Sequence, residues 1–331
     1  MRWYSFGVAF VLVVCGDVCA GAGDSQCEVA AVCVTDLTDE DCGAGYKMMP
    51  NSNIFNCCPR CVLDTEPDPE TPCPATANCL PDGTYAPVQC KGDNFLGRCF
   101  CTNAEGKRIF GQMWRNDADK MTCACSRKRA DLEAAGRTDV TLHCTAQGDY
   151  EPLQCDDGVC WCAEPSTGQP TVAPVAEADM TRLPCYSKTQ MGESYLRKCE
   201  SVVHALAVIQ REQIEHGTNF LGNPVTFCDY DGSFGPVQIR NNIAYCTNRE
   251  GDIVGSWGTP QSEMTGMNCN CALDTTVHYP AAGLSVSQSC LPNGNYDPKQ
   301  QAGEQRYCVD SDGYQASPYA ATWPDDCIDY A

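Results

Sequence analysis

Cysteine is the one residue type in this chain that is both abundant and regularly spaced enough to do chemistry. The 331 residues include 28 cysteines, roughly 8% of the chain and in the range of disulfide scaffolds. Metal binding by closely spaced cysteines fits this chain poorly, because it has only four histidines and an N-terminus typical of an exported protein. No GxSxG or HExxH motif and no Cys–His arrangement is present. We therefore expect disulfide bonds, no enzymatic activity, no cofactor and no metal.

The first residues predict the compartment in which these bonds form. Met1 and Arg2 give a short positive start, residues 6–15 are apolar, and small residues follow at Ala20 and Ala22, which is typical of a signal peptide. The apolar run is too short to span a bilayer about 30 Å thick. Cleavage near residue 20 would remove Cys15 and Cys19, and 28 minus 2 leaves an even 26 cysteines. We expect a secreted, extracellular protein with a signal peptide at 1–20 and no membrane span.

The charge of the chain limits its partners. The formal net charge is −21, which argues against nucleic acid because phosphate binding depends on Lys and Arg. Weak calcium binding would need carboxylates clustered in a defined loop, and none has EF-hand spacing. The simpler interpretation of the acidity is solubility.

A short string recurs four times along the chain and defines its organisation. Glycine is followed at two-residue steps by an aromatic residue, proline and glutamine, at 83–89, 148–154, 232–238 and 294–300. Each copy has a cysteine four residues before the glycine, an aromatic–cysteine pair after the glutamine, and a closing cysteine about twenty residues later. The aromatic residues are expected to form most of each small core. The sequence therefore predicts four tandem modules.

The second copy identifies the family that the modules resemble. It contains Gln154-Cys155, Cys160-Trp161-Cys162 and a closing Cys185, which resembles the thyroglobulin type-1 domain with its QC and CWC signature. The first copy has Gln89-Cys90 and Cys99-Phe100-Cys101. The resemblance implies small disulfide-rich α+β modules in tandem, each with a short helix and a small antiparallel sheet. We expect repeats at 73–123, 125–185, 199–269 and 271–327, linkers at 66–72 and 186–198, and an N-terminal cysteine-rich module at 24–65 whose CCPxC ending loosely resembles von Willebrand factor C-type modules.

The resemblance also implies a disulfide pairing, because the family joins its cysteines one to two, three to four and five to six. Carried onto this chain, the pairs are Cys73–Cys79, Cys90–Cys99, Cys101–Cys123, Cys125–Cys144, Cys155–Cys160, Cys162–Cys185, Cys199–Cys228, Cys246–Cys269, Cys271–Cys290 and Cys308–Cys327. Repeats three and four lack both members of the three–four bridge: Ile239 and Ala244 stand there in one, Gln301 and Arg306 in the other. This joint loss, which strands no thiol, supports the pairing. Pairing within the N-terminal module stays open.

Helices are expected after the first cysteine of two repeats. Repeat two offers 127–135 with Ser126 as N-cap and Gly136 after the helix. Repeat three offers a longer segment in which Val202, Ala205, Leu206 and Ile209 share one face and Gly217 ends the helix. Repeat one has too few residues between its first two cysteines for a helix. His143, beside Cys144, is expected to be exposed, and 186–198 to be a flexible linker.

Function is inferred from the family, which divides into two groups. In thyropins the domain enters the active-site cleft of papain-like cysteine proteases, or occasionally acts on aspartic proteases; elsewhere it is a module of matrix, carrier and cell-surface proteins. A chain made mostly of these modules resembles the first group, so we expect an inhibitor of extracellular or lysosomal-type, cathepsin L-like proteases. A non-inhibitory matrix or binding scaffold is the alternative, with a matrix protein as its partner, and nothing specific favours a hormone carrier.

The resemblance implies that three loops of a repeat contact the protease. In repeat two they lie at 136–140, 156–159 and 165–170, and the predicted contact residues are Gly136, Arg137, Thr138, Asp156, Asp157, Gly158, Pro165, Ser166, Thr167 and Gly168. Repeat three adds Phe220 and Leu221 in a longer first loop, but its second loop, 240–243, has no bridge. Repeat one keeps a second loop at 91–98 and lacks the first. Repeat two is therefore the predicted inhibitory copy, while each loop could equally be an ordinary solvated turn.

Overall fold

A computed structural model of the protein describes residues 38–42, 46–49, 60–63, 73, 77–93, 96–137, 140–191, 195–218, 225–324 and 327. The predicted signal peptide and most of the N-terminal module lie outside the described residues. Of that module the structure describes a 3-10 turn, Asp39–Cys42, and an antiparallel pair, β1 (Tyr46–Met49) and β2 (Arg60–Leu63). Within the described ranges, no helix combines the length and apolar character needed to cross a membrane.

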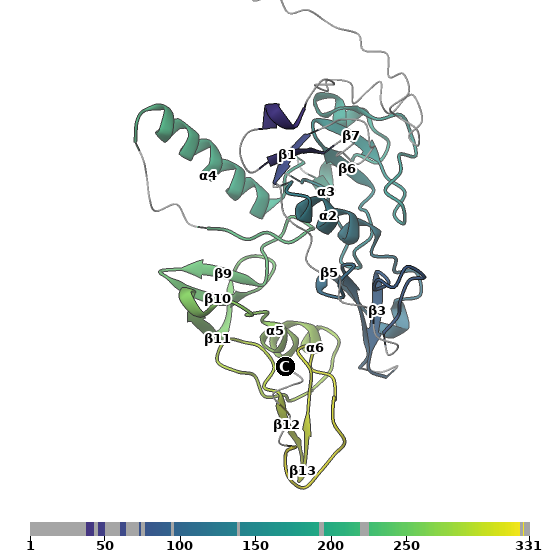
Figure 1. Ribbon diagram of the computed structural model, residues 1–331, viewed down its shortest axis with the longest axis vertical. Helices are drawn as coiled ribbons and strands as arrows, with labels where there is room; N and C mark the ends of the chain where they lie inside the picture. Colours follow the sequence, from purple (N-terminus) through teal and green to yellow (C-terminus); the bar gives the residue numbers. More distant parts are fainter. Residues whose placement is uncertain are drawn as a thin grey trace, which may run out of the picture.

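The rest of the chain forms four small lobes, each with its own antiparallel hairpin (Figure 1). The first three lobes have three-stranded sheets and the last has two strands. The strands are β3 (Val88–Lys91), β4 (Arg98–Thr102) and β5 (Arg108–Trp114); β6 (Leu153–Asp156), β7 (Val159–Cys162) and β8 (Val175–Ala176); β9 (Val237–Arg240), β10 (Ile243–Thr247) and β11 (Ile253–Pro260); β12 (Lys299–Ala302) and β13 (Gln305–Cys308). The small α+β modules expected from the sequence are confirmed.

The recurring string has a structural explanation in all four lobes. Its glycine has a positive φ, between +75° and +89°, which favours glycine in a tight turn. Its aromatic residue then forms an antiparallel bridge with the preceding cysteine, as in Cys144 and Tyr150. Its glutamine amide makes two hydrogen bonds to the residue before that cysteine: in repeat two, Gln154 accepts from the His143 amide (2.9 Å) and donates to its carbonyl (2.7 Å). The glutamine side chain thus extends the contact between these two segments beyond the single backbone bridge.

Ten disulfide bonds lie within the four lobes, and each joins two cysteines of the same lobe. They are the ten pairs that the resemblance implies. Cys155 and Cys160 lie directly opposite each other on β6 and β7, with Cα atoms 4.0 Å apart. Cys90 and Cys99 occupy the same place in repeat one. In the hairpin of repeat three, Ile239 and Ala244 pair across the ladder at the corresponding position.

The helices begin and end for local reasons. Helix α2 (Ala124–Ala134) starts earlier than predicted, and Ser126 lies inside it, because Cys123 takes a left-handed conformation (φ 58°) and acts as N-cap. Helix α5 (Asn270–Leu273) starts in the same way after Cys269 (φ 57°). It continues through a π-turn, Asp274–His278, into α6 (Tyr279–Ala281). The two CxC junctions therefore turn the chain in the same manner.

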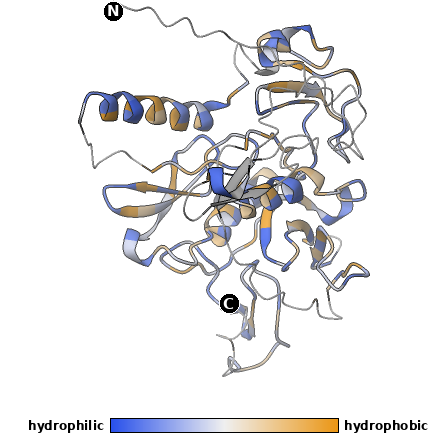
Figure 2. Cartoon of the chain, turned by 45° about the horizontal axis from the view of Figure 1, so that its top comes forward, coloured by the Kyte–Doolittle hydropathy of each residue, from blue (hydrophilic) through white to orange (hydrophobic). Residues whose placement is uncertain are grey.

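Helix α4 (Lys198–Glu215) forms where predicted and ends at Gly217 (φ 73°), but its apolar face is not covered. Cys199 is its only buried residue, while Val202 and Ile209 are 39% and 45% exposed. By contrast Leu132, seven residues after the first cysteine of repeat two, is 5% exposed and belongs to the core. Figure 2 shows α4 projecting from the body of the molecule with hydrophobic and hydrophilic residues alternating along it.

Two predictions about the junction between repeats two and three were wrong. His143 is fully buried, because its Nε2 lies 2.7 Å from Glu200 Oε2 and its ring stacks on Tyr195 at 4.2 Å between centroids. Segment 186–198 is not simply a flexible linker: it contains α3 (Lys188–Met191), and Tyr195 is 3% exposed. One aromatic side chain thus anchors the connection to the second repeat.

The same junction carries a group that makes stability depend on pH. Burial, followed by the nearby Asp231 carboxylate, raises the pKa of Asp229 to about 7. A carboxyl group with a raised folded pKa favours the folded state at low pH, and this advantage is lost as pH rises from about 4 to about 7. Because Asp229 keeps some solvent contact, we expect the free energy of unfolding to fall by about 2 kcal/mol over this pH range. Chemical denaturation at pH 4.5 and pH 8 should show this fall in the free energy of unfolding for the native protein but not for Asp229→Asn. An equal fall in both proteins would contradict the prediction.

Candidate functional site: the hairpin end of the second repeat

The exposed end of the β6–β7 hairpin is built from two residues. Asp157 and Gly158 have φ of 56° and 76°, the pattern of a type I′ turn, which matches the twist of a two-residue hairpin. Both are exposed, whereas Asp156 and Val159 on either side are buried. A Cβ added at Gly158 would meet nothing within 4 Å. The turn therefore projects from the repeat, and the Cys155–Cys160 bridge lies directly beneath it.

A buried ion pair ties the first predicted loop to this turn. The Arg137 guanidinium donates two hydrogen bonds to the Asp156 carboxylate, at 2.8 and 3.0 Å, and the two side chains are 2% and 0% exposed. Thr141 adds a hydrogen bond from its hydroxyl to the Cys155 carbonyl at 2.7 Å. Bidentate arginine–carboxylate pairs are geometrically demanding, so the two loops are held in one arrangement.

A third segment reaches the same end of the repeat, but it is not the one predicted. The Glu177 amide donates to the Gly158 carbonyl at 2.9 Å, and β8 pairs with the start of β7. The contribution of this 3-10 segment, Glu177–Arg182, was missed because nothing in its sequence distinguishes it from a linker. Together, 136–137, 156–159 and 176–177 form what we call the repeat-two tip.

The predicted third loop lies at the other end of β7. Gly168 accepts a hydrogen bond from the Trp161 indole (2.9 Å), and a Cβ at this glycine would run into the ring of Tyr150. The loop follows Cys162, which pairs with Leu153, whereas the tip follows Asp156, which pairs with Val159. Three residues of strand, about 10 Å, separate the two ends. Pro165, Ser166, Thr167 and Gly168 are therefore not brought together with the tip. Thr138, Phe220 and Leu221 lie outside the described residues.

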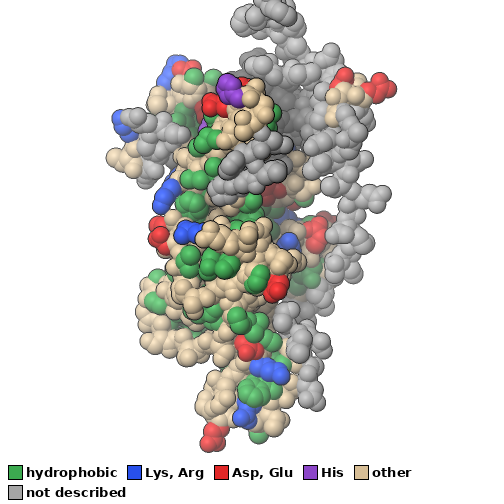
Figure 3. Space-filling view, turned by 90° about the vertical axis from the view of Figure 1, so that its left-hand side faces the viewer, with side chains coloured by type: hydrophobic (Ala, Val, Ile, Leu, Met, Phe, Trp, Pro, Cys, Tyr) green, Lys and Arg blue, Asp and Glu red, His purple; other side chains and the backbone are tan. Residues whose placement is uncertain are grey.

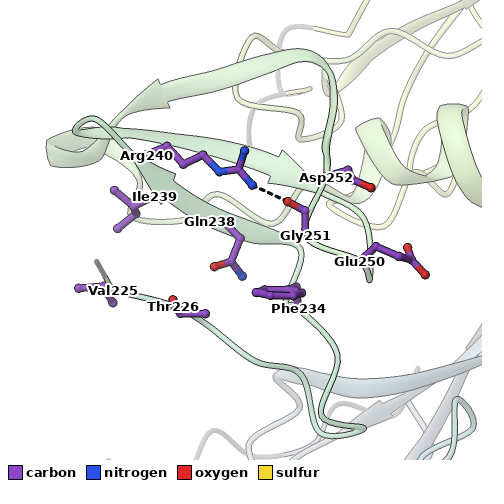
Figure 4. Close-up of a pocket in the computed structure, with 9 residues that line it drawn as sticks. All are labelled: Val225, Thr226, Phe234, Gln238, Ile239, Arg240, Glu250, Gly251 and Asp252. Atoms are coloured by element: carbon purple, nitrogen blue, oxygen red, sulfur yellow. Dashed lines mark hydrogen bonds between the residues drawn. The ribbon is translucent and has the colours of Figure 1, made fainter. Parts of the chain in front are cut away.

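Repeat three has a similar turn without the supporting contacts. Asn241 and Asn242 have φ of 53° and 61°, but Arg240 stands where repeat two has Asp156, and donates to the Gly251 carbonyl at 2.7 Å. A cleft of about 250 Å³ lies between β9 and the segment at Val225 and Thr226 (Figure 4). The repeat is therefore more open at the place that Arg137 and Thr141 close in repeat two.

The described residues contain no group of three or more His, Cys, Asp or Glu side chains placed to hold a metal ion. In the tip, the cysteines are in the disulfide and Asp156 is engaged by Arg137. The exposed residues of the tip are Asp157, Gly158, Ala176 and Glu177. This arrangement suits recognition by shape and backbone hydrogen bonds.

Comparison with known proteins agrees with the repeat structure. The family model of the thyroglobulin type-1 repeat matches residues 69–123 and 124–180. Thyroglobulin of Bos taurus is 26% identical over 178 residues, which cover 48% of this chain and 6% of thyroglobulin. Equistatin of Actinia equina is 30% identical over 93 residues, 26% of this chain and 39% of equistatin. The matched region is thus a small part of thyroglobulin and less than half of equistatin. Two adjoining segments of the chain, 69–123 and 124–180, thus match the thyroglobulin type-1 repeat.

Proposed function

We propose that the protein is a secreted inhibitor of papain-like cysteine proteases of the cathepsin L type, and that the repeat-two tip enters their active-site cleft. The observation that carries the proposal is the support beneath an exposed turn: Cys155–Cys160 and the buried Arg137–Asp156 pair fix Asp157 and Gly158. A segment already fixed loses little conformational entropy on binding, so modest contact area can give tight binding. The thyroglobulin type-1 family, to which equistatin is related, includes cysteine protease inhibitors, and its members serve as inhibitors or precursors rather than enzymes.

We also propose that 199–269 and 271–327 are divergent copies of the same repeat. Three shared features support this: the positive-φ glycine, the cysteine–aromatic bridge, and the glutamine bonded to the residue before the cysteine. The disulfide content and the predicted signal peptide support secretion. In this scheme the third and fourth copies lost the hairpin bridge and serve structural roles.

A matrix or binding scaffold is the second candidate, and α4 favours it. Val203 and Ile214 on this helix are 41% and 61% exposed, and hydrophobic side chains lie among polar ones over this side of the molecule (Figure 3). Such a helix face is typical of a surface that binds another protein. Under this function, the protein would bind a matrix partner and leave proteases active.

Inhibition measured with the full chain tests the proposed function. We expect native protein to inhibit papain or a cathepsin L-like enzyme at submicromolar concentration, and Gly158→Asn to weaken inhibition at least about tenfold, or 1.4 kcal/mol. Asparagine tolerates the left-handed conformation and its side chain would project outward without a clash inside the repeat.

The matched control is Gly303→Asn, at the corresponding turn of repeat four, where φ is 62° and a Cβ also meets nothing within 4 Å. This variant should inhibit as the native protein does. If native protein fails to inhibit at micromolar concentration, the scaffold function is favoured. Equal inhibition by native protein and Gly158→Asn would exclude the tip as the contact.

A further inference from the structure

The first and fourth repeats, although distant in sequence, meet through a buried ion pair. The Arg98 guanidinium of repeat one donates to both carboxylate oxygens of Asp274 in repeat four, at 2.5 and 2.6 Å. The two residues are 3% and 2% exposed. Tyr296 donates a further hydrogen bond to the same carboxylate at 2.6 Å. Removing one member of such a pair is costly because a buried charge is left alone, so the two repeats are held together here.

Aromatic rings from both repeats surround this arginine. The Arg98 guanidinium carbon lies 5.4 to 5.9 Å from the ring centroids of Phe100 and Trp114 in repeat one and of Tyr279 and Tyr314 in repeat four. These distances are within the range of cation–π attraction. Burial raises the pKa of both tyrosines, so their rings stay neutral in mild acid. The aromatic part of the contact therefore does not respond to pH by itself.

A chain of hydrogen bonds joins the two repeats beside this ion pair. It begins at Asp312 of repeat four, whose carboxylate accepts from Arg108 Nη1 at 2.5 Å. Arg108 Nη2 donates to Gln112 Oε1 at 2.7 Å, and Gln112 Nε2 lies 3.2 Å from Nε2 of His278. Arg108 and Gln112 are on β5 of repeat one, whereas His278 ends the π-turn of repeat four. The chain therefore starts on repeat four, crosses repeat one and returns to repeat four.

The donors and acceptors of this chain run in one direction only. A guanidinium group has donors and no acceptor, so Gln112 must present its carbonyl oxygen to Arg108 and its NH2 group to His278. The Nε2 atom of His278 must then accept a hydrogen bond, which is possible only in a neutral imidazole with its hydrogen on Nδ1. Gln112 cannot turn its amide over, because its NH2 group would then face Arg108. The closed contact therefore accommodates His278 only in its neutral form.

The charges around His278 favour the same neutral form. Burial lowers the pKa of His278, Asp274 on the same turn opposes this effect, and three arginines lower the pKa further: Arg98 on β4, Arg108 on β5 and Arg249 after β10. A base whose pKa is lowered by a contact favours that contact above its ordinary pKa of about 6.5. This advantage is lost as pH falls below that value. The closed contact is therefore expected to weaken in mild acid.

The other end of the hydrogen-bond chain keeps its charge over the same pH range. Lys91 of repeat one reaches Asp310 and Asp312, at 2.8 and 2.7 Å. Burial would raise the pKa of Asp312, but Arg108 and Lys91 hold it below its ordinary value. Asp312 thus remains ionised at pH 5 and continues to hold Arg108, which in turn keeps the Gln112 amide in place. The chain cannot adjust when its histidine takes up a proton.

We propose that the contact between the first and fourth repeats is an acid-sensitive clasp, which holds the two repeats together at neutral pH and releases them when His278 is protonated. The added proton lies on Nε2, where Gln112 already presents a hydrogen, and the new charge faces Arg98 and Arg108. Release separates Trp114 of repeat one from Tyr279 of repeat four, whose rings lie 6.4 Å apart in the closed contact. The clasp involves neither the repeat-two tip nor a protease, so it stands independently of the proposed function.

The test follows the opening of the clasp in the full chain by hydroxyl-radical footprinting at pH 7.5 and pH 5. The rates of modification of Tyr279 and Tyr314 are divided by the rate of Tyr186, a half-buried tyrosine at the edge of the repeat-two core. This ratio removes the effect of pH on the labelling chemistry. In the native protein it should rise at least about threefold between pH 7.5 and pH 5, as local opening exposes the two rings. An unchanged ratio, whether low or high at both pH values, would overturn the proposal.

Two variants assign the response to His278. His278→Gln offers Gln112 an amide oxygen that does not titrate, so the ratio should stay low at both pH values. Gln112→Glu replaces the donor with an acceptor that protonated His278 can bind, so its ratio should also stay low at pH 5. The matched control is His216→Gln, at an exposed histidine after α4, which should respond to acid as the native protein does.

Disulfide mapping shows whether each variant remains folded, through Cys101–Cys123 in repeat one and Cys271–Cys290 in repeat four. If His278→Gln is open at both pH values because glutamine does not fit the site, Gln112→Glu decides the question alone. A native-like rise of the ratio at pH 5 in folded Gln112→Glu would show that the polarity of the hydrogen-bond chain does not control the clasp, and would overturn the proposal.

Discussion

Replacing Arg137 with alanine is expected to lower the free energy of unfolding of the second repeat by about 3–5 kcal/mol, the cost of leaving one member of a buried ion pair unpaired. The Asp156 carboxylate has no exposed surface, so it cannot recover its lost partner from bulk water. The same change should loosen the repeat-two tip, because Arg137 joins the first loop to the hairpin. Denaturant unfolding of the full chain, followed by hydrogen exchange in β6 and β7, measures both effects.

The matched control is Arg182→Ala. Arg182 lies 3.5 Å from Asp179 in the same repeat, but the two side chains are 74% and 52% exposed. An exposed pair of this kind contributes about 0–1 kcal/mol. Equal destabilisation by the two alanine variants would show that burial of Arg137 and Asp156 does not determine the stability of the tip.

Removing the Cys162–Cys185 bridge, by changing both cysteines to alanine, is expected to cost about 3 kcal/mol. The bridge closes a loop of 23 residues in sequence separation, and the chain-entropy relation gives this value for such a loop. It also packs against Leu153, Met180 and Leu183 in the core beneath the sheet. Thermal unfolding resolved by hydrogen exchange in repeat two should show the loss.

The comparison is Cys155→Ala/Cys160→Ala, whose bridge has a sequence separation of 5 and a predicted cost of about 2 kcal/mol. The β9–β10 and β12–β13 hairpins form without a bridge at this position, which fits its smaller contribution. If its removal costs more than removal of Cys162–Cys185, loop closure is not the source of the stabilisation.

The sequence predicted best what recurs within a repeat. The cysteine framework recurs four times, and the positions of Cys155 and Cys160 are replaced together in two copies. This joint replacement supports the disulfide pairing from the sequence alone. The role of Gln154 was missed, although its recurrence was visible, because a glutamine that caps a neighbouring backbone leaves no apolar periodicity. The predicted third loop does not lie beside the tip, since family resemblance gives its position in the chain but not which end of β7 it follows.

Contacts between repeats could not be predicted. Arg98 and Asp274 are 176 residues apart, and neither belongs to the recurring string. Nothing in the sequence around His143 indicates that it is buried. Its ring packs against Tyr195, which lies in a segment that the sequence suggests is a linker. The helix in repeat three was predicted correctly from its periodicity, yet periodicity does not say whether another element covers that face.

The central claim is that a covalent bridge beneath an exposed turn makes that turn able to enter a protease cleft. The most direct measurement is the inhibition constant of the full chain against a cathepsin L-like protease, with and without the Cys155–Cys160 bridge. The account predicts that Cys155→Ala/Cys160→Ala stays folded, as hydrogen exchange in β7 would show, and inhibits at least about tenfold more weakly. Equal inhibition constants for the two folded proteins would contradict it.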